Sequence, residues 1–184
     1  MRKRYLLLVF AAIFGLSLLA VERYTTELTA PESEVVSDEP DYYGEQLSHR
    51  RYGADGKVEQ RLQAQASEHF DSSGESHLKS PVVISGNSPE QSWQASADSG
   101  VIRDSDTEVR LQGNVLLQSL QQQNPVSISS DSMTYSPDQA IATTNDWVTI
   151  TNGNSETTSK GLTVDTQRQR LEFKEQVTTR YVQQ

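Results

Sequence analysis

The sequence contains no cysteine among its 184 residues, and it is poor in aromatic and apolar residues. Without cysteine the fold has no disulfide framework and no thiolate metal site. Apolar residues make up 34% of the chain and aromatic residues 7%, whereas ordinary soluble domains are about 45–50% apolar. A large part of the apolar residues also lies in one run at the N-terminus. The rest of the chain must therefore fold around a thin core or remain unfolded.

The common catalytic and phosphate-binding motifs are also missing. The sequence has no GxSxG elbow, no glycine-rich phosphate loop and no HExxH pair. His69, Asp71, Glu75 and His77 could be drawn as a metal site, but no second ligand cluster supports it, and a solvated hairpin loop is the simpler interpretation. The acidic stretch RDSDTE at 103–108 lacks the glycine and the distal glutamate of a calcium loop. We therefore expect a protein that is not an enzyme and needs no metal or cofactor.

Acidic residues outnumber basic ones, with 25 Asp and Glu against 16 Lys and Arg, for a net charge of −9. No basic stripe is present to contact phosphates, which argues against nucleic acid as a partner. An acidic domain also repels other anions over about a Debye length, ~8–10 Å at physiological salt. Any anionic ligand would have to be recognised through its apolar part.

One long apolar run opens the chain. Residues 5–21 read YLLLVFAAIFGLSLLAV and follow Arg2, Lys3 and Arg4 directly. A signal-peptide core is about 7–15 residues long, whereas about 17–19 residues at ~1.5 Å each nearly span a ~30 Å hydrocarbon layer. Length, and the lack of a small-x-small cleavage site, favour a retained membrane helix over a cleaved signal peptide. The basic residues then keep residues 1–4 in the cytoplasm and place the rest of the chain across the membrane.

Residues 22–41 are predicted to form a linker, and residues 42–184 a separate domain. The linker is acidic, contains Pro31 and Pro40 and shows no sustained period. Beyond it the apolar residues alternate with polar ones, most clearly at Val109, Leu111, Val115 and Leu117. Clusters of Pro and Gly typical of turns separate the alternating stretches, at 52–56, 85–90, 122–126, 135–140 and 151–156. This pattern predicts an all-β domain of many short strands.

A repeat of about 30 residues runs through the predicted β-domain. Val83, Val115, Val148 and Val177 each close a unit of two alternating strands joined by a turn. The first strands of the units are RLQAQA, SWQASA, SISSDS and ETTSKG. Such a period predicts stacked hairpin units, none of which covers its own apolar face. The faces can meet only if the sheet curls over itself, as in a jelly roll or an open barrel.

Two interpretations of the resulting interior stay open. Many of the inward-facing residues are small or interrupted by Ser and Gly, so the interior could be apolar with room for a hydrophobic ligand, or it could be an ordinary thin sandwich core. The candidate lining residues are Leu62, Ala64, Leu78, Val83, Trp93, Ala95, Val109, Leu111, Val115, Leu117, Tyr135, Val148, Ile150, Leu162, Leu171, Phe173 and Val177.

The stretch RYGADGKVEQRLQAQASEHF at 51–70 resembles the first two strands of the LptC family, the membrane-anchored periplasmic components of the lipopolysaccharide transport system. The features shared with that family are a Tyr, a turn Gly, an Arg-Leu-x-Ala strand and a closing aromatic, here Tyr52, Gly56, Arg61, Leu62, Ala64 and Phe70. The similarity covers nearly the whole chain, through DYY at 41–43, PVV at 81–83, W-x-A-x-A at 93–97, L-x-G-x-V at 111–115, Gly161-Leu162 and VTTRY at 177–181. The stretch at 149–161 departs from it: we expect a longer loop there, with Gly153 only near a glycine of the family.

The resemblance implies a twisted β-jelly roll with an apolar groove, behind a single transmembrane helix in the inner membrane. It further implies that an ABC transporter of LptB, LptF and LptG extracts lipopolysaccharide from the inner membrane, and that the groove receives the acyl chains and passes them to LptA. The helix is implied to contact LptF and LptG. The bulk of the chain would then lie in the periplasm.

Two sheet edges are candidate partner sites. The last predicted strand contains no Pro, and its apolar row, Leu171, Phe173, Val177 and Tyr181, would continue the groove into LptA. At the other end we expect the strand at 57–65, which begins with Lys57 and Val58, to face the transporter. Two alternatives stay open: the last strand pairs on both sides within the fold, or the protein is a membrane-tethered periplasmic scaffold that joins partners without binding lipid.

Overall fold

The computed structural model describes residues 14–17, 21, 39–86, 88, 91–103, 108–123 and 125–181. The chain divides into two units, Met1–Asp38 and Glu39–Gln184. In the first unit residues 14–17 are helical, and no helix among the described residues is long and apolar enough to cross a membrane. Most of the apolar run at 5–21 and of the linker at 22–41 lies outside the described residues, so the membrane helix and the linker stay predictions.

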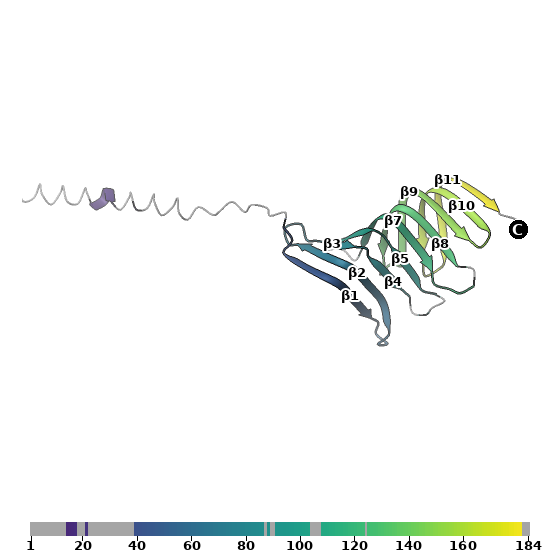
Figure 1. Ribbon diagram of the computed structural model, residues 1–184, viewed down its shortest axis with the longest axis horizontal. Helices are drawn as coiled ribbons and strands as arrows, with labels where there is room; N and C mark the ends of the chain where they lie inside the picture. The colour runs from purple at the N-terminus through teal and green to yellow at the C-terminus, as the bar shows by residue number, and fades with distance from the viewer. Residues whose placement is uncertain are drawn as a thin grey trace, which may run out of the picture. The chain divides into compact units, whose positions relative to one another are not determined.

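The second unit is all-β, as the alternation predicts. Figure 1 shows its strands following one another from β1 at one end to β11 at the other. The strands are β1 (Tyr42–Tyr52), β2 (Val58–Phe70), β3 (Glu75–Lys79), β4 (Val82–Ser85), β5 (Trp93–Ser96), β6 (Ser99–Arg103), β7 (Val109–Ser119), β8 (Val126–Ser136), β9 (Ile141–Asn152), β10 (Ser155–Asp165) and β11 (Arg170–Tyr181).

All strands belong to one antiparallel sheet. From β7 to β11 each strand pairs with the next along the chain. Between β2 and β7, short strands take the place of long ones: β4 and β5 bridge one half of β2 to one half of β7, and β3 and β6 bridge the other halves. β1 covers the free side of β2.

A line of bends crosses this sheet and divides each long strand into two halves. The pairing shifts by one residue near the middle of every pair from β7 to β11. Residues at these shifts have positive φ angles, including Gly113 (78°), Gly161 (78°) and Gln176 (49°), and Ser80 (50°) forms the corresponding corner between β3 and β4. Bulges of this kind bend a strand and increase its twist. The sheet therefore curves over along the line of bends (Figure 1) and its two halves form the layers of a sandwich.

The core lies between the two layers. Val109, Leu111, Val115 and Leu117 have exposures of 3%, 2%, 0% and 0%, while Arg110 and Gln112 between them are exposed. The predicted alternation in this stretch is confirmed. Gly113 lies in the bulge between Leu111 and Val115 and provides the bend, and the inward row resumes at Val115 in the other layer.

The repeat corresponds to pairs of neighbouring strands: β2 with β4, β5 with β7, β8 with β9, and β10 with β11. Its valines have equivalent places in the first three units, where Val83, Val115 and Val148 are at most 2% exposed. Val177 is 51% exposed, because no further strand of the described sheet packs beyond β11.

One expectation about elements needs correction, and one strand was missed. The stretch at 149–161 is not a long loop: β9 continues to Asn152 and β10 begins at Ser155, so only Gly153 and Asn154 form the turn. Its Thr and Ser residues suit a polar strand face, and Gly153, with φ 56°, allows a two-residue hairpin turn. Strand β1 was not predicted, because its mostly exposed side chains show no apolar alternation.

We expect the bend at Gly113 to depend on the missing side chain as well as on backbone freedom. A Cβ at Gly113 would lie 2.7 Å from Asp98 Oδ2 and 3.1 Å from Asp98 Cβ, whereas a Cβ at Gly153 would meet nothing within 4 Å. Both glycines have positive φ angles, so Gly153→Ala should lower the free energy of unfolding by about 1–2 kcal/mol and Gly113→Ala by about 1 kcal/mol more. Urea denaturation of both variants measures the difference. Equal losses would show that the contact with Asp98 is unimportant.

Candidate functional site

The predicted lining residues lie together in one hydrophobic core. All those from Leu62 to Leu162 are buried, and Leu171 is partly buried against them. Phe173 and Val177, on β11, are 36% and 51% exposed. The core also includes Ile128 and Ala142, which the sequence analysis did not single out; Ile128 does follow the alternation of β8, but the Ser residues around it conceal the pattern.

Three contacts join the two layers at the strand ends farthest from the line of bends. The Arg51 guanidinium at the end of β1 forms an ion pair with Asp138 in the turn between β8 and β9. The hydroxyls of Ser85 (β4) and Tyr135 (β8) are hydrogen-bonded to each other. Trp93 Nε1, at the start of β5, donates to the Thr166 carbonyl oxygen at 3.0 Å. We call these three contacts the seam, because together they hold the open side of the sandwich closed.

Small cavities flank the seam. One of about 250 Å³ lies between residues of the two layers, including Ser85 and Gln91 on one side and Asp138 and Thr166 on the other. A second of about 210 Å³ has Trp93 and Val126 on one side and Leu171 on the other. Beside these cavities only a few side chains separate the interior from solvent.

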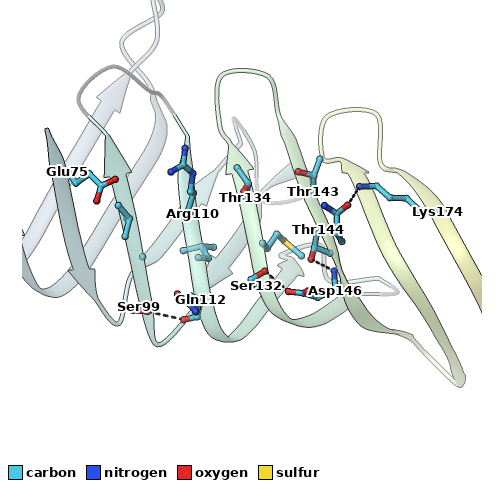
Figure 2. A pocket seen from close by; sticks show the side chains of 15 residues that line it. Glu75, Ser99, Arg110, Gln112, Ser132, Thr134, Thr143, Thr144, Asp146 and Lys174 are labelled. Carbon is cyan, nitrogen blue, oxygen red and sulfur yellow. Dashed lines mark hydrogen bonds between the residues drawn. The ribbon is translucent and has the colours of Figure 1, made fainter. Parts of the chain in front are cut away.

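A larger polar groove of about 580 Å³ lies across the outer face of the layer that contains β3 and β6 (Figure 2). Its side chains come from strands β3, β6, β7, β8, β9 and β11 and are mostly hydroxyls, amides and charged groups. Arg110 and Gln112 point into it because they alternate with the inward Val109 and Leu111. The sequence carries no recognisable signal for this groove, since polar residues on an outer face are the ordinary pattern of an exposed sheet.

The charged groups of this polar groove are paired with their neighbours. Lys174 Nζ donates to Asn145 Oδ1 at 2.7 Å, and the Ser132 hydroxyl donates to Asp146. Arg103 Nε donates to Glu75 Oε1 at 2.8 Å, and this bond, followed by the one to His77, holds the pKa of Glu75 below its usual value. These internal pairs already satisfy the charged side chains of Lys174, Asp146 and Glu75.

The two acidic segments considered as metal sites form turns and strand ends. His69 Nδ1 lies 2.9 Å from Ser76 Oγ, and His77 Nε2 lies 3.3 Å from Glu75 Oε2. In the described ranges no group of three or more His, Asp or Glu is placed to hold a metal ion. Residues 104–107 of RDSDTE lie outside those ranges, while Glu108 accepts a hydrogen bond from Ser136 at 2.7 Å.

The sheet ends in β11 on one side and in β1 on the other. β11 stands last in the strand order and pairs with β10. Its apolar row faces inward, since Phe173 is opposite Leu162 and Leu171 is opposite Val164. The expectation that the strand at 57–65 forms the other edge is wrong: Val58 belongs to β2, which β1 covers, and Lys57 lies in the turn between β1 and β2. The edge there is β1, with Tyr42, Tyr43 and Tyr52 exposed.

The seam should make stability depend on pH through Tyr135. This side chain is 1% exposed, and its burial raises its pKa above the usual value, with the Ser85 hydrogen bond opposing the shift only in part. Above about pH 10 the unfolded chain loses a proton that the folded chain keeps, so the free energy of unfolding should fall as pH rises. Tyr135→Phe should lower the free energy of unfolding by about 1 kcal/mol at pH 7, and its free energy of unfolding should not show this fall above pH 10. Denaturation curves from pH 7 to 11 measure both effects.

Tyr43→Phe is the matched control, because it removes a hydroxyl from a side chain that is 84% exposed. It should behave as the wild type at every pH. If Tyr135→Phe and the wild type lose stability in parallel above pH 10, the seam hydroxyl is not responsible for the alkaline loss.

Comparison with known proteins identifies the family. The family model described as lipopolysaccharide-assembly, LptC-related, matches residues 5–182. No match was found among curated proteins. Among solved structures, LptH from Pseudomonas aeruginosa, described as the LptA-homologous periplasmic component of the lipopolysaccharide transport device, has a similar fold, with a TM-score of 0.54 at 13% identity over 67% of this chain and 95% of that chain. The chain belongs to the LptC-related family of lipopolysaccharide-assembly proteins.

Proposed function

We propose that this protein carries the acyl chains of lipopolysaccharide between its two layers and passes them on along β11. Membership of the LptC-related family supports a role in lipopolysaccharide transport rather than catalysis. The observation that carries the finer proposal is the inward apolar row, which continues beyond the closed core. Along β11 it passes from partly buried Leu171 to Phe173, Val177 and Tyr181, which are 36%, 51% and 80% exposed.

The acyl chains would enter by opening the seam. An exposed ion pair such as Arg51–Asp138 contributes about 0–1 kcal/mol, and each of the two hydrogen bonds about 0.5–1.5 kcal/mol. Each CH₂ group moved from water into the interior gains about 0.8 kcal/mol, so about five of them offset the whole seam. The seam therefore adds little to the packing of the core between the layers, and an acyl chain can offset it.

The charge of the chain supports recognition through acyl chains. The domain at 42–184 has 18 Asp and Glu against 12 Lys and Arg, so it repels the phosphates of lipopolysaccharide at long range. Lipid phosphates and sugars would remain in solvent at the seam while the chains lie inside. The core residues from Leu62 to Leu162, together with Leu171, Phe173 and Val177, would provide the contacts.

The two edges suit two partners. An edge strand offers unpaired N–H and C=O groups to a strand from another chain, and β11 also offers an uncovered apolar row. We assign β11 to LptA, and β1 in place of the strand at 57–65 to the transporter of LptB, LptF and LptG. The apolar run at 5–21 would anchor the chain in the inner membrane, with the domain in the periplasm.

A scaffold that binds no lipid is the second candidate, and the filled core favours it. Val83, Ala95, Val115 and Leu117 have no measurable exposure, so lipid can enter only if the layers separate. A lipid carrier and a lipid-free scaffold would both bind partners through β1 and β11. They differ in whether acyl chains reach the inward face of the sheet.

Photo-crosslinking distinguishes the two. We expect p-benzoylphenylalanine at Phe173, which faces inward and is already aromatic, to crosslink to lipopolysaccharide in cells, and the same group at Glu172, which points to the opposite face, to give no product. Immunoblots of both full-length variants measure the products. Equal crosslinking at the two positions, or none at Phe173 in a folded protein, would support the scaffold.

Deletion of residues 173–184 tests the assignment of β11. The truncated protein should remain in the membrane and associated with the transporter, but should no longer capture LptA, because the pairing edge is gone. The double variant Val177→Ser, Tyr181→Ser keeps the strand backbone and should retain capture. Co-purification from membranes measures both. A truncated chain that is folded and binds LptA as well as the full chain does would exclude edge pairing through β11.

A further inference from the structure

Two arginines lie directly opposite each other on the outer face of β1 and β2. Arg50 and Arg61 are partners in the pairing of these strands, so their side chains share one face of the sheet. That face is the outer one, since the neighbouring Leu62 is in the core. Like charges directly opposite each other destabilise a sheet. In a chain with a net charge of −9, carboxylates are plentiful, so a neutralising partner for this pair would be expected within the protein.

No such partner is found in the described part of the chain. Three other arginines have one: Arg51 pairs with Asp138, Arg103 with Glu75 and Arg168 with Asp165. Arg50 and Arg61 have no carboxylate within 4 Å among the described residues. The nearby Glu59 carboxylate turns toward Gly53, in the hairpin between β1 and β2.

The Arg61 guanidinium also has one hydrogen-bond donor without an acceptor. Its Nε is buried and has no hydrogen-bond partner. Arg61 is opposite Ile84 of β4 and lines a cavity of about 340 Å³, together with Ser88, Ser92, Leu120 and the Glu59 side chain that extends toward Gly53. A buried donor without an acceptor is a cost that a ligand oxygen would remove. This differs from the polar groove of Figure 2, whose Lys174 and Glu75 are satisfied by neighbouring side chains.

We propose that Arg50 and Arg61 form a binding site for a phosphate group on the outer face of the domain. A carboxylate can occupy one guanidinium fork, whereas a phosphate dianion has enough oxygens to accept from two arginines at once. The site is separate from the acyl-chain path, because Leu62 and Ala64 on the same strand face the other side of the sheet. The phosphate is either inorganic phosphate or the phosphomonoester headgroup of a lipid.

The test is a titration of the full chain, ¹⁵N-labelled at arginine, in an uncharged detergent with inorganic phosphate at constant ionic strength. The Arg61 Nε–H signal should shift saturably, with a dissociation constant of about 1 mM. Arg61→Met keeps the aliphatic stem over Ile84 and should abolish binding measured by calorimetry, and Arg50→Gln should weaken it about tenfold. Arg168→Gln removes the same charge from an arginine already paired with Asp165 and should leave binding unchanged.

Acetate and phosphatidic acid are the two further ligands in this test. Acetate should bind at least about tenfold more weakly than phosphate. Phosphatidic acid in the same micelles should displace inorganic phosphate if the natural source is a lipid headgroup, and should leave it bound if the source is free phosphate. The proposal is overturned if the Nε–H shift stays linear with phosphate, if acetate binds as tightly, or if Arg168→Gln weakens binding as much as Arg61→Met.

Discussion

The fold depends on one constraint: a single sheet has to bend along a line that crosses every long strand. A flat sheet with this sequence would leave one apolar face in water, and no helix among the described residues of the domain is available to cover it. Bending brings the two halves of that face together. At Gly113 and Gly161 the bends need positive φ angles, which residues other than glycine adopt at a cost. A side chain at these positions would also collide with Asp98 or Lys174. The core, the seam and the exposed row on β11 all follow from the position of that line.

The inward face could be predicted because burial imposes a period on the sequence. Val109 and Leu111 on one side of the bend, and Val115 and Leu117 on the other, had to be apolar at alternate positions, and several of the turns between strands contain Gly, Pro or Asn. Strand β1 could not be predicted in this way, because its role is to pair with β2 through the backbone while most of its side chains stay in solvent. The mistaken edge at Lys57 and Val58 follows directly from the missed strand.

The candidate sites were predictable to a smaller extent. Sequence periodicity identified the residues that face inward, but not whether they enclose space, because packing depends on how closely the two layers approach. The seam joins residues as distant in sequence as Arg51 and Asp138, and a pair of this kind has no local pattern. Net charge was also a poor guide at short range: the whole chain is acidic, yet Arg50 and Arg61 make one part of the outer face basic.

No strand of the described sheet covers β11, so the sandwich has an edge at which it could be extended. Within the domain, β10 receives β11 through the same backbone pairing and inward row by which β9 receives β10. In the edge pairing that we propose, a strand from another chain would repeat this step, and the apolar interior would lengthen by one strand spacing, about 4.8 Å, each time. A closed barrel has a fixed interior and a fixed capacity. In the function that we propose, the domain would instead be one section of a conduit, whose length would be set by how many sections are joined.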